Sequence, residues 1–480
     1  MRKNPFSYDA IRDVYDKENR KGNINLSMLP ADYCDIIQNI QDKRRELFRL
    51  KRISIKKMDT HTKATHLSQL SRIKKEISHL YEIKENRLEE LLRNIEKQLN
   101  NNSFRYEITR DERYYEKTGK ESFHTKGEYL KSMIMSKLLC IDLTSAFKVK
   151  TSDRHYIMSC IKSLLVAEKN FFIIRTDIQN FFESIPHNLV LNQLQDNPLI
   201  SGKTIGCIRS VLVQYDKIKS GGANGIGIPR GIAISSYLSE IIMRDFDMNI
   251  QKMPNVLFYA RYVDDIFILL SNINPRESLD DFFSSISTDI SKKGLKLHPA
   301  ASTKSVFINY NPNIASSQSI EYLGYKIQFC QKNITFHLSD KRYKRIRQRI
   351  DNAFNHFEFI YKSNPRKARI DLIDSLNMLS GNTSLHKSKN GVRTGLYFSN
   401  DLLSDKNKQL SLIQDYYINV KVNNLVLDEK SFGTIELKDA YLNRLKKKLL
   451  LINFPERWKE RKMYSFSIKR LKELSTILGE

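Results

Sequence analysis

Negative charge is scarce in this sequence of 480 residues: 54 Asp and Glu stand against 80 Lys and Arg, and the formal net charge is +26. Such an excess is atypical of a near-neutral metabolic enzyme and favours a polyanionic partner, of which nucleic acid is the simplest. Hydrophobic residues still make up 40% of the chain, including 24 Phe and 23 Tyr. This content excludes a disordered basic tail and predicts a folded protein.

Cysteines and long apolar runs are scarce as well. The five cysteines lie far apart with no C-x-x-C pair, which argues against a zinc ribbon or a disulfide framework and fits a reducing cytosol. No stretch approaches about 18 uncharged apolar residues, and residues 1–10 lack the apolar core of a signal peptide. We therefore expect a cytoplasmic protein with no membrane partner.

Glycine and proline are absent between Pro30 and Gly119. Apolar residues recur there every three or four positions among many charges, which predicts two charged helices, each with one apolar stripe. Packing of this helical hairpin on the main body is one interpretation, and a coiled coil that joins two copies of the chain is the other. The stripes are Leu67, Leu70, Ile73, Ile77 and Leu80, and then Leu88, Leu91, Ile95 and Leu99.

Short β-rich runs follow residue 150, at 171–174, 256–259 and 266–270, with helical spacing at 232–248 between them. This order predicts an α+β fold rather than a doubly wound sheet. Beyond residue 331 the pattern is helical, and Ser339 or Asp340 can cap a helix whose first turns are crowded with Lys and Arg. We expect three parts: a helical extension at 1–103, an α+β region at 104–335 and a helical, basic region at 336–480.

Three aspartates stand at the ends of strand-like runs. Asp264 and Asp265 lie between two such runs, in the tetrapeptide Tyr262-Val263-Asp264-Asp265, and Asp177 directly follows another. Like charges about 4 Å apart repel by about 4 kcal/mol at an effective dielectric constant of about 20, so a cation should compensate them. Three such carboxylates can bind two Mg²⁺ ions that support an in-line phosphoryl displacement. An ordinary turn is the alternative for Asp264 and Asp265.

Five segments, in this order, resemble motifs A to E of reverse transcriptases. The resemblance implies a right-hand polymerase with an antiparallel palm sheet, whose fingers and palm occupy 104–335 and whose thumb lies within 336–480. It also implies an RNA template, a DNA product, dNTP substrates and two Mg²⁺ ions, with Mn²⁺ as a substitute. The segments are residues 177–182 (DIQNFF), 227–236 (GIPRGIAISS), 258–266 (FYARYVDDI), 294–304 and 321–325 (EYLGY).

The resemblance also assigns roles to single residues. Asp177, Asp264 and Asp265 match the metal-binding acids, and the Ile178 carbonyl is expected near the nucleotide-bound metal. Phe182 matches the bulky steric gate that leaves no room for a 2′-hydroxyl, so deoxynucleotides should be preferred. A core phenylalanine is the alternative for Phe182.

Four further residues match positions near the nucleotide. Gly231 is expected to allow a close approach of the templating base and the nucleotide. Arg230 stands where many reverse transcriptases carry Gln, and its guanidinium can bind a phosphate or a base edge. Lys304 matches the lysine proposed to protonate departing pyrophosphate, with a solvated surface charge as the alternative. Arg154 resembles the arginine of the fingers that meets incoming phosphates, with a salt bridge as the alternative.

The helical additions at both ends resemble prokaryotic reverse transcriptases of antiphage defence, including the abortive-infection type. Some members of that group copy an associated non-coding RNA, and others extend DNA from a protein tyrosine without a conventional template. Retron enzymes are another possible match. A scaffold that binds nucleic acid without catalysis is the rival from outside the enzymes. Self-association through the N-terminal helices also stays open.

Overall fold

The computed structural model describes residues 4–53, 59–101, 104–127, 129–150, 152–167, 170–219, 221, 224–271, 278–314, 317–331, 333–384, 393–404, 408–428 and 432–479. The chain forms two compact units, each made of two separate stretches: Met1–Thr151 with Asn180–Arg244, and Ser152–Gln179 with Asp245–Glu480. The boundaries suggested by the sequence at residues 103 and 335 fall inside these units. Within the described ranges, no helix is both long and apolar enough to cross a bilayer.

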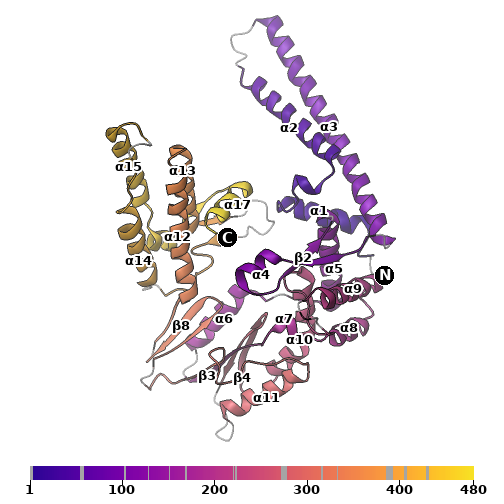
Figure 1. Ribbon diagram of the computed structural model, residues 1–480, viewed down its shortest axis with the longest axis vertical. Helices are drawn as coiled ribbons and strands as arrows, with labels where there is room; N and C mark the ends of the chain where they lie inside the picture. Colours follow the sequence, from indigo (N-terminus) through magenta and orange to yellow (C-terminus); the bar gives the residue numbers. More distant parts are fainter. Residues whose placement is uncertain are drawn as a thin grey trace. The chain divides into compact units, whose positions relative to one another are not determined.

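The first unit is mainly helical (Figure 1). Its two short strands pair as an antiparallel hairpin. Its elements are α1 (Tyr8–Arg20), η1 (Leu26–Met28), α2 (Ala31–Lys51), α3 (Thr60–Asn100), β1 (Glu107–Arg110), α4 (Glu112–Thr118), β2 (Phe123–Lys126), α5 (Tyr129–Phe147), α7 (Phe181–Ser184), α8 (His187–Gln195), α9 (Gly202–Ile218) and the first part of α10 (Ala233–Gln251).

A helical hairpin is present, but its helices differ from the predicted ones: both apolar stripes lie on the single helix α3. The partner of α3 is α2, which lies beside it (Figure 1). Asp59 caps α3 by accepting the Thr62 amide at 2.7 Å, and with no Gly or Pro inside it the helix runs unbroken for 41 residues. Leu88 and Ile95 belong to the buried cluster of the first unit, together with residues of α1 and α5. The second of the two predicted stripes is therefore packed inside this unit.

The second unit is built on a four-stranded sheet of order β4-β5-β3-β6, in which all neighbours are antiparallel. A three-stranded antiparallel sheet, β7-β8-β9, follows, so the predicted α+β class is confirmed. The elements up to this point are α6 (Arg154–Ala167), β3 (Phe171–Asp177), β4 (Val256–Tyr262), β5 (Asp265–Leu270), α11 (Leu279–Ser291), β6 (Val306–Tyr310), β7 (Gln318–Tyr322), β8 (Tyr325–Cys330) and β9 (Asn333–Leu338).

The C-terminal part of the second unit is mainly helical, as the sequence predicts. Its elements are α12 (Asp340–Ile360), α13 (Pro365–Ser380), β10 (Asn382–Ser384), β11 (Arg393–Gly395), α14 (Lys408–Asp415), the π-helix η3 (Tyr416–Val422), α15 (Ile435–Leu450), α16 (Phe454–Lys459), β12 (Met463–Tyr464) and α17 (Ile468–Ile477). Its three short strands form a separate sheet of order β11-β10-β12.

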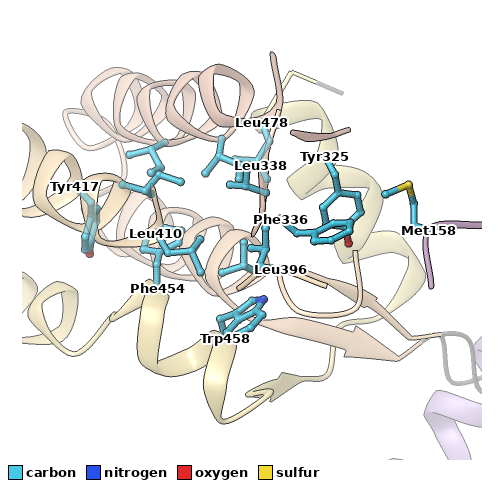
Figure 2. Packing of buried hydrophobic residues seen from close by; sticks show 14 of the residues in the cluster. Met158, Tyr325, Phe336, Leu338, Leu396, Leu410, Tyr417, Phe454, Trp458 and Leu478 are labelled. Atoms are coloured by element: carbon cyan, nitrogen blue, oxygen red, sulfur yellow. The ribbon is translucent and has the colours of Figure 1, made fainter. Parts of the chain in front are cut away.

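One hydrophobic cluster joins the strands and helices of the second unit. Figure 2 shows Tyr325 and Phe336 near Met158 of α6, with Trp458 of α16 in the same cluster. The polar atom of the indole is satisfied, because Nε1 of Trp458 donates to the Asn400 carbonyl at 3.2 Å. The C-terminal helices are therefore anchored to the sheets by a shared core.

Helix α12 matches the sequence prediction on its apolar side and departs from it on its basic side. Ser339 is the N-cap, and Ile346, Ile350 and Phe354 are buried. Arg342, one of the basic residues in the first turn, donates to the Ser399 carbonyl at 3.1 Å and to Asn400 Oδ1 at 2.6 Å, so it does not extend into solvent. Burial, together with the nearby guanidinium of Arg154, lowers the pKa of Arg342 to about 10.

Two phenylalanines on α12 provide a matched test of this core. Phe357 is fully buried and Phe359 is 80% exposed. Phe357→Ala should lower the free energy of unfolding by about 3–5 kcal/mol, because it removes a buried ring and leaves a cavity, whereas Phe359→Ala should change it by less than about 0.5 kcal/mol. Urea unfolding can be followed by fluorescence of Trp458, the single tryptophan, which lies in the same cluster. Equal losses in the two variants would contradict this assignment of the core.

Candidate active site

Asp177 and Asp265 face each other on neighbouring strands. Asp177 ends β3 and pairs in register with Asp265, the first residue of β5. Residues directly opposed in an antiparallel pair have Cβ atoms about 4.5–5.5 Å apart, so two carboxylates lie side by side at one end of the sheet. Asp264 precedes Asp265 in the turn, and its carbonyl accepts the Ile178 amide at 3.1 Å. The structure thus brings the three predicted aspartates together, and their binding of metal stays a prediction.

The turn that carries Asp264 has an unusual backbone. Tyr262 pairs with Asp265, so Val263 and Asp264 alone connect β4 to β5. Val263 has a φ of 62°, in the left-handed region that β-branched residues rarely adopt, at a cost of about 1–3 kcal/mol. The surrounding structure must therefore hold this turn in place.

The buried side chain of Arg261 provides this support. Arg261 is only 2% exposed at its side chain, and its Nη1 donates to the Val263 carbonyl at 2.8 Å. Its Nε and Nη2 bind both carboxylate oxygens of Asp247 at 2.9 and 2.8 Å, and Asp247 also accepts the Tyr259 hydroxyl at 2.6 Å. This network is not predicted from the sequence. Its only local signal was Tyr259 and Arg261 at alternate positions of β4, and Asp247 is too distant in sequence to be linked to them.

Two cations neutralise the aspartates in the described structure. Arg175 Nε lies 2.8 Å from Asp265 Oδ1, and Lys304 Nζ lies 3.5 Å from Asp177 Oδ2. Arg175 Nη1 also donates to the Lys304 carbonyl at 3.1 Å, which links the two cations. The sequence predicts Lys304 at this site but does not predict Arg175. The available signal was a cation two residues before Asp177, which places both side chains on one face of the strand.

The environment of Asp265 disfavours its charge. Burial raises the pKa of Asp265 to about 6, the Arg175 guanidinium opposes this rise, and the charges of Asp177 and Asp264 add to it. A group of acids in such a setting is typical of functional sites.

The donor atoms at this end of the sheet fit a divalent ion. Carboxylate oxygens are the ligands that Mg²⁺ prefers, and Asp177 Oδ1 is buried and accepts no hydrogen bond from any described residue. The described residues nevertheless contain no group of three His, Cys, Asp or Glu side chains already arranged to hold a metal. A divalent ion would therefore have to compete with Arg175 and Lys304 for the carboxylates.

The segment that follows β3 is held by backbone hydrogen bonds to residues 296–298. The His298 amide donates to the Asp177 carbonyl at 3.0 Å, and the Gln179 amide donates to the Lys296 carbonyl at 2.8 Å. Ile178 and Leu297 form an antiparallel bridge between these contacts. The backbone on both sides of Ile178 is therefore held in place by hydrogen bonds within the protein.

Phe182, Arg230 and Gly231 belong to the first unit. Arg230 binds Glu183 through two hydrogen bonds, from Nε to Oε1 at 3.1 Å and from Nη2 to Oε2 at 3.2 Å, and its guanidinium lies 5.5 Å from the centre of the Phe182 ring. The Phe182 carbonyl accepts the Ile228 amide at 2.7 Å. The guanidinium near the Phe182 ring is thus held in place by Glu183. The phosphate or base contact expected for Arg230 stays a prediction.

Gly231 makes a close approach, but its partner is the protein itself. Gly231 has a φ of 94°, and a Cβ atom there would lie 2.6 Å from the Phe123 carbonyl oxygen and 2.5 Å from Ser122 Oγ. The neighbouring Arg230 carbonyl accepts the Phe123 amide at 2.7 Å. Gly231 therefore packs closely against the start of β2, and its expected approach to nucleotide and template stays a prediction.

Arg154, expected to meet incoming phosphates, contacts backbone carbonyls of its own unit. Its Nε donates to the Leu323 carbonyl at 2.7 Å and its Nη1 to the Ser399 carbonyl at 3.2 Å. The guanidinium lies 5.1 Å from the centre of the Tyr325 ring. These contacts attach Arg154 to the turn between β7 and β8, and a phosphate contact stays a prediction.

Residues 88–327, half of the chain, match the family model described as reverse transcriptase (RNA-dependent DNA polymerase). No curated protein matches the chain. Solved structures to which it is similar include telomerase from Candida albicans in complex with the TWJ fragment of telomeric RNA, at 12% identity over 73% of this chain and 56% of that chain with a TM-score of 0.33. Apo telomerase from Candida tropicalis gives 12% identity, 71% and 58% coverage and a TM-score of 0.34.

Apo telomerase from Candida tropicalis truncated from its C-terminal domain matches at 17% identity, over 41% of this chain and 44% of that chain, with a TM-score of 0.31. The chain thus spans between 44% and 58% of the length of these telomerases.

The raised pKa of Asp265 gives a pH-dependent prediction. Because its pKa is above the ordinary value, the stability that Asp265 contributes is complete below about pH 4 and is lost as the pH rises through about 6. Without divalent metal, Asp265→Asn should therefore be more stable than the wild type at pH 7.5, by roughly 1–3 kcal/mol, and lose this advantage near pH 4.

Urea unfolding in EDTA at both pH values measures this effect. Glu358→Gln, which removes a carboxylate from an exposed position on α12, is the control and should not gain stability at pH 7.5. A wild type more stable than Asp265→Asn at pH 7.5 would mean that the contact with Arg175 outweighs the burial of the charge.

Proposed function

The chain belongs to the reverse transcriptase (RNA-dependent DNA polymerase) family, and we propose that it synthesises DNA from dNTPs on an RNA template. The observation that carries this proposal is the meeting of Asp177, Asp264 and Asp265 at one end of the β4-β5-β3-β6 sheet. Asp264 lies in a two-residue turn supported by Arg261. This geometry suits a polymerase because it fixes carboxylates where phosphoryl transfer needs divalent ions.

Asp177, Asp264 and Asp265 would hold two Mg²⁺ ions, with the Ile178 carbonyl beside them. When bound, these ions would lower the pKa of the primer hydroxyl and neutralise charge on the triphosphate. The protein contributes orientation, because the Ile178 amide is fixed on the Asp264 carbonyl and the Asp177 carbonyl is fixed on the His298 amide. Lys304, 3.5 Å from Asp177, is suited to give a proton to departing pyrophosphate.

The finer assignment rests on the resemblance alone. We propose a right-hand arrangement of fingers, palm and thumb and a role in antiphage defence, with an associated non-coding RNA as template. Helical regions on both sides of the matched residues 88–327 support an origin among the defence-associated enzymes. Protein-primed or untemplated synthesis and a retron enzyme are the alternatives. Phage plating on cells that carry wild type or Asp264→Ala tests the defence role, and equal plating would remove it.

Incorporation of labelled dNTP tests the polymerase activity. Wild-type protein with Mg²⁺ should extend a primer on RNA, and Asp177→Ala and Asp264→Ala should lower the rate by at least about a thousandfold, or roughly 4 kcal/mol, because each removes a metal ligand. EDTA should abolish incorporation. Asp280→Asn, at an exposed position of α11, is the control that removes an aspartate away from the site.

Reactions with RNA template, DNA template and no template separate templated from untemplated synthesis. Equal incorporation by wild type and Asp264→Ala would defeat the enzymatic proposal and favour the silent scaffold. Incorporation of ribonucleotides alone would contradict the choice of DNA as product.

The ion pair between Arg230 and Glu183 gives a prediction on sugar selection. Phe182→Ala should lower the preference for dNTP over rNTP by about tenfold or more, or roughly 1.4 kcal/mol, because it removes the ring proposed to exclude the 2′-hydroxyl. Arg230→Gln and Glu183→Gln should each lower the preference by a smaller factor, because each removes or frees the guanidinium near the ring.

The ratio of kcat/KM values for dNTP and rNTP measures this preference in each variant. Arg209→Gln, at an exposed position of α9 in the same unit, is the matched control and should keep the wild-type ratio. If Arg230→Gln lowers both kcat/KM values equally, the ion pair supports the fold without selecting the sugar.

A further inference from the structure

The outer part of the helical hairpin formed by α2 and α3 takes no part in the main core of the first unit. The hairpin extends away from α1 and α5 (Figure 1). The α3 residues that join the buried cluster of this unit all lie between Leu88 and Leu99. We call residues 43–53 and 59–81 the distal arm. Its own packing is limited, with Ile73 and His66 as its buried side chains among the described residues.

Charge is distributed unevenly along this hairpin. The distal arm contains ten Lys and Arg but only three Asp and Glu. All three acids are already engaged: Asp59 caps α3, Glu46 pairs with Lys43 at 3.3 Å, and Glu76 pairs with Lys43 at 2.7 Å. Seven basic side chains are exposed and form no ion pair with any residue that the structure describes: Arg44, Arg49, Lys51, Arg52, Lys63, Lys74 and Lys75.

The inner half of the same hairpin is different, because its arginines are paired. Arg87 lies 2.6 Å from Asp32 and 2.8 Å from Glu90, and Arg93 lies 2.7 Å from Glu89. Paired charges of this kind suit a solvated helix surface. Apart from Lys84 and Lys97, the cations of the described hairpin that form no ion pair therefore lie on the distal arm.

Exposed rings lie among the unpaired cations. Phe48 is 63% exposed, and the Arg52 guanidinium lies 5.7 Å from its ring centre. Tyr81 is 37% exposed, with the Arg44 guanidinium 5.3 Å from its ring centre. Unpaired bases stack on flat aromatic and guanidinium groups, and nearby positive charges neutralise the backbone phosphates.

We propose that the distal arm is an RNA-binding surface separate from the aspartate site. The seven unpaired cations neutralise phosphates, and Phe48 and Tyr81 stack against unpaired bases. The choice of RNA over DNA rests on the proposed function, whereas the charge and the exposed rings are independent of it. The arm would then hold a single-stranded part of an RNA outside the reaction centre.

Self-association is the competing role for this hairpin, and the charge distribution opposes it. Two distal arms in contact would bring two sets of unpaired cations together, and like charges repel. Ile73 is also already covered within the hairpin. A polyanion gains from the same charges, because each neutralised phosphate releases counterions.

Binding of a fluorescent single-stranded RNA to the full chain tests the proposal. Measurement in EDTA without dNTP makes the result independent of polymerase activity. The triple variant Arg49→Gln, Lys74→Gln, Lys75→Gln should reduce the slope of log K against log[salt] by about 2, at about 0.7 for each lost contact with a single strand. Phe48→Ala should weaken binding about tenfold at constant slope, through lost stacking.

A matched triple variant removes the same charge elsewhere in the first unit. Lys17→Gln, Arg20→Gln and Lys217→Gln alter exposed basic residues and should leave both affinity and slope close to wild type. Phe48 and the three basic residues of the arm are exposed, so thermal unfolding should be unchanged in every variant.

Four outcomes would overturn the proposal. The first is an equal change in the two triple variants, and the second is no effect of Phe48→Ala. The third is equal or tighter binding of single-stranded DNA or polyglutamate through the arm. The last is a dimer in sedimentation that the arm variant alone dissociates. If the wild type binds RNA through the arm but incorporates no dNTP, the polymerase proposal fails and the proposal for the arm stands.

Discussion

Asp177 and Asp265 face each other across β3 and β5, and their like charges repel. The second unit must hold the two carboxylates together against this repulsion. Their alignment follows from the same register that buries Ile173 and Leu269 on those strands. A slip of one residue would turn both the acids and the apolar side chains to the opposite face. The hydrophobic core therefore also fixes the position of the charges, and no separate element is needed to bring the acids together.

The cost of this alignment is offset locally. Arg175 and Lys304 supply positive charge to Asp265 and Asp177, and they are connected through the Lys304 carbonyl. Arg261 acts on the backbone instead, where it holds the Val263 carbonyl in a turn with a strained residue. Arg175 and Lys304 thus neutralise the carboxylates, whereas Arg261 stabilises the backbone of the turn. Such division allows the carboxylates to change partners while the turn keeps its shape.

Local pattern was enough for the elements and for the three aspartates, because strand ends and turns are properties of neighbouring residues. The β4–β5 hairpin and the buried side of α12 follow from periodicity and caps. The helical character of residues 60–100 also follows from periodicity, although the sequence suggested two helices where the structure has α3 alone. Contacts between distant residues were not accessible in this way. Asp247 beneath Arg261 depends on tertiary packing that no spacing predicts.

Basic residues were the least predictable. A guanidinium suits phosphates and backbone carbonyls equally, so sequence could not distinguish the carbonyl contacts of Arg154 and Arg342 from an outward position. Arg230 shows the same ambiguity, because its partner Glu183 lies 47 residues away. The seven unpaired cations of the distal arm stand out only once the paired ones are known.

Each of the two units is assembled from two stretches, with the segment Ser152–Gln179 entering the second unit between the two parts of the first. Because the ribosome synthesises the chain from its N-terminus, the first unit is complete only after residue 244 has emerged. Before that point α6 and β3 emerge without the strands that later flank them. Long-range closure of this kind slows folding and leaves strand edges exposed, so the order of synthesis itself makes chaperone assistance valuable for this protein.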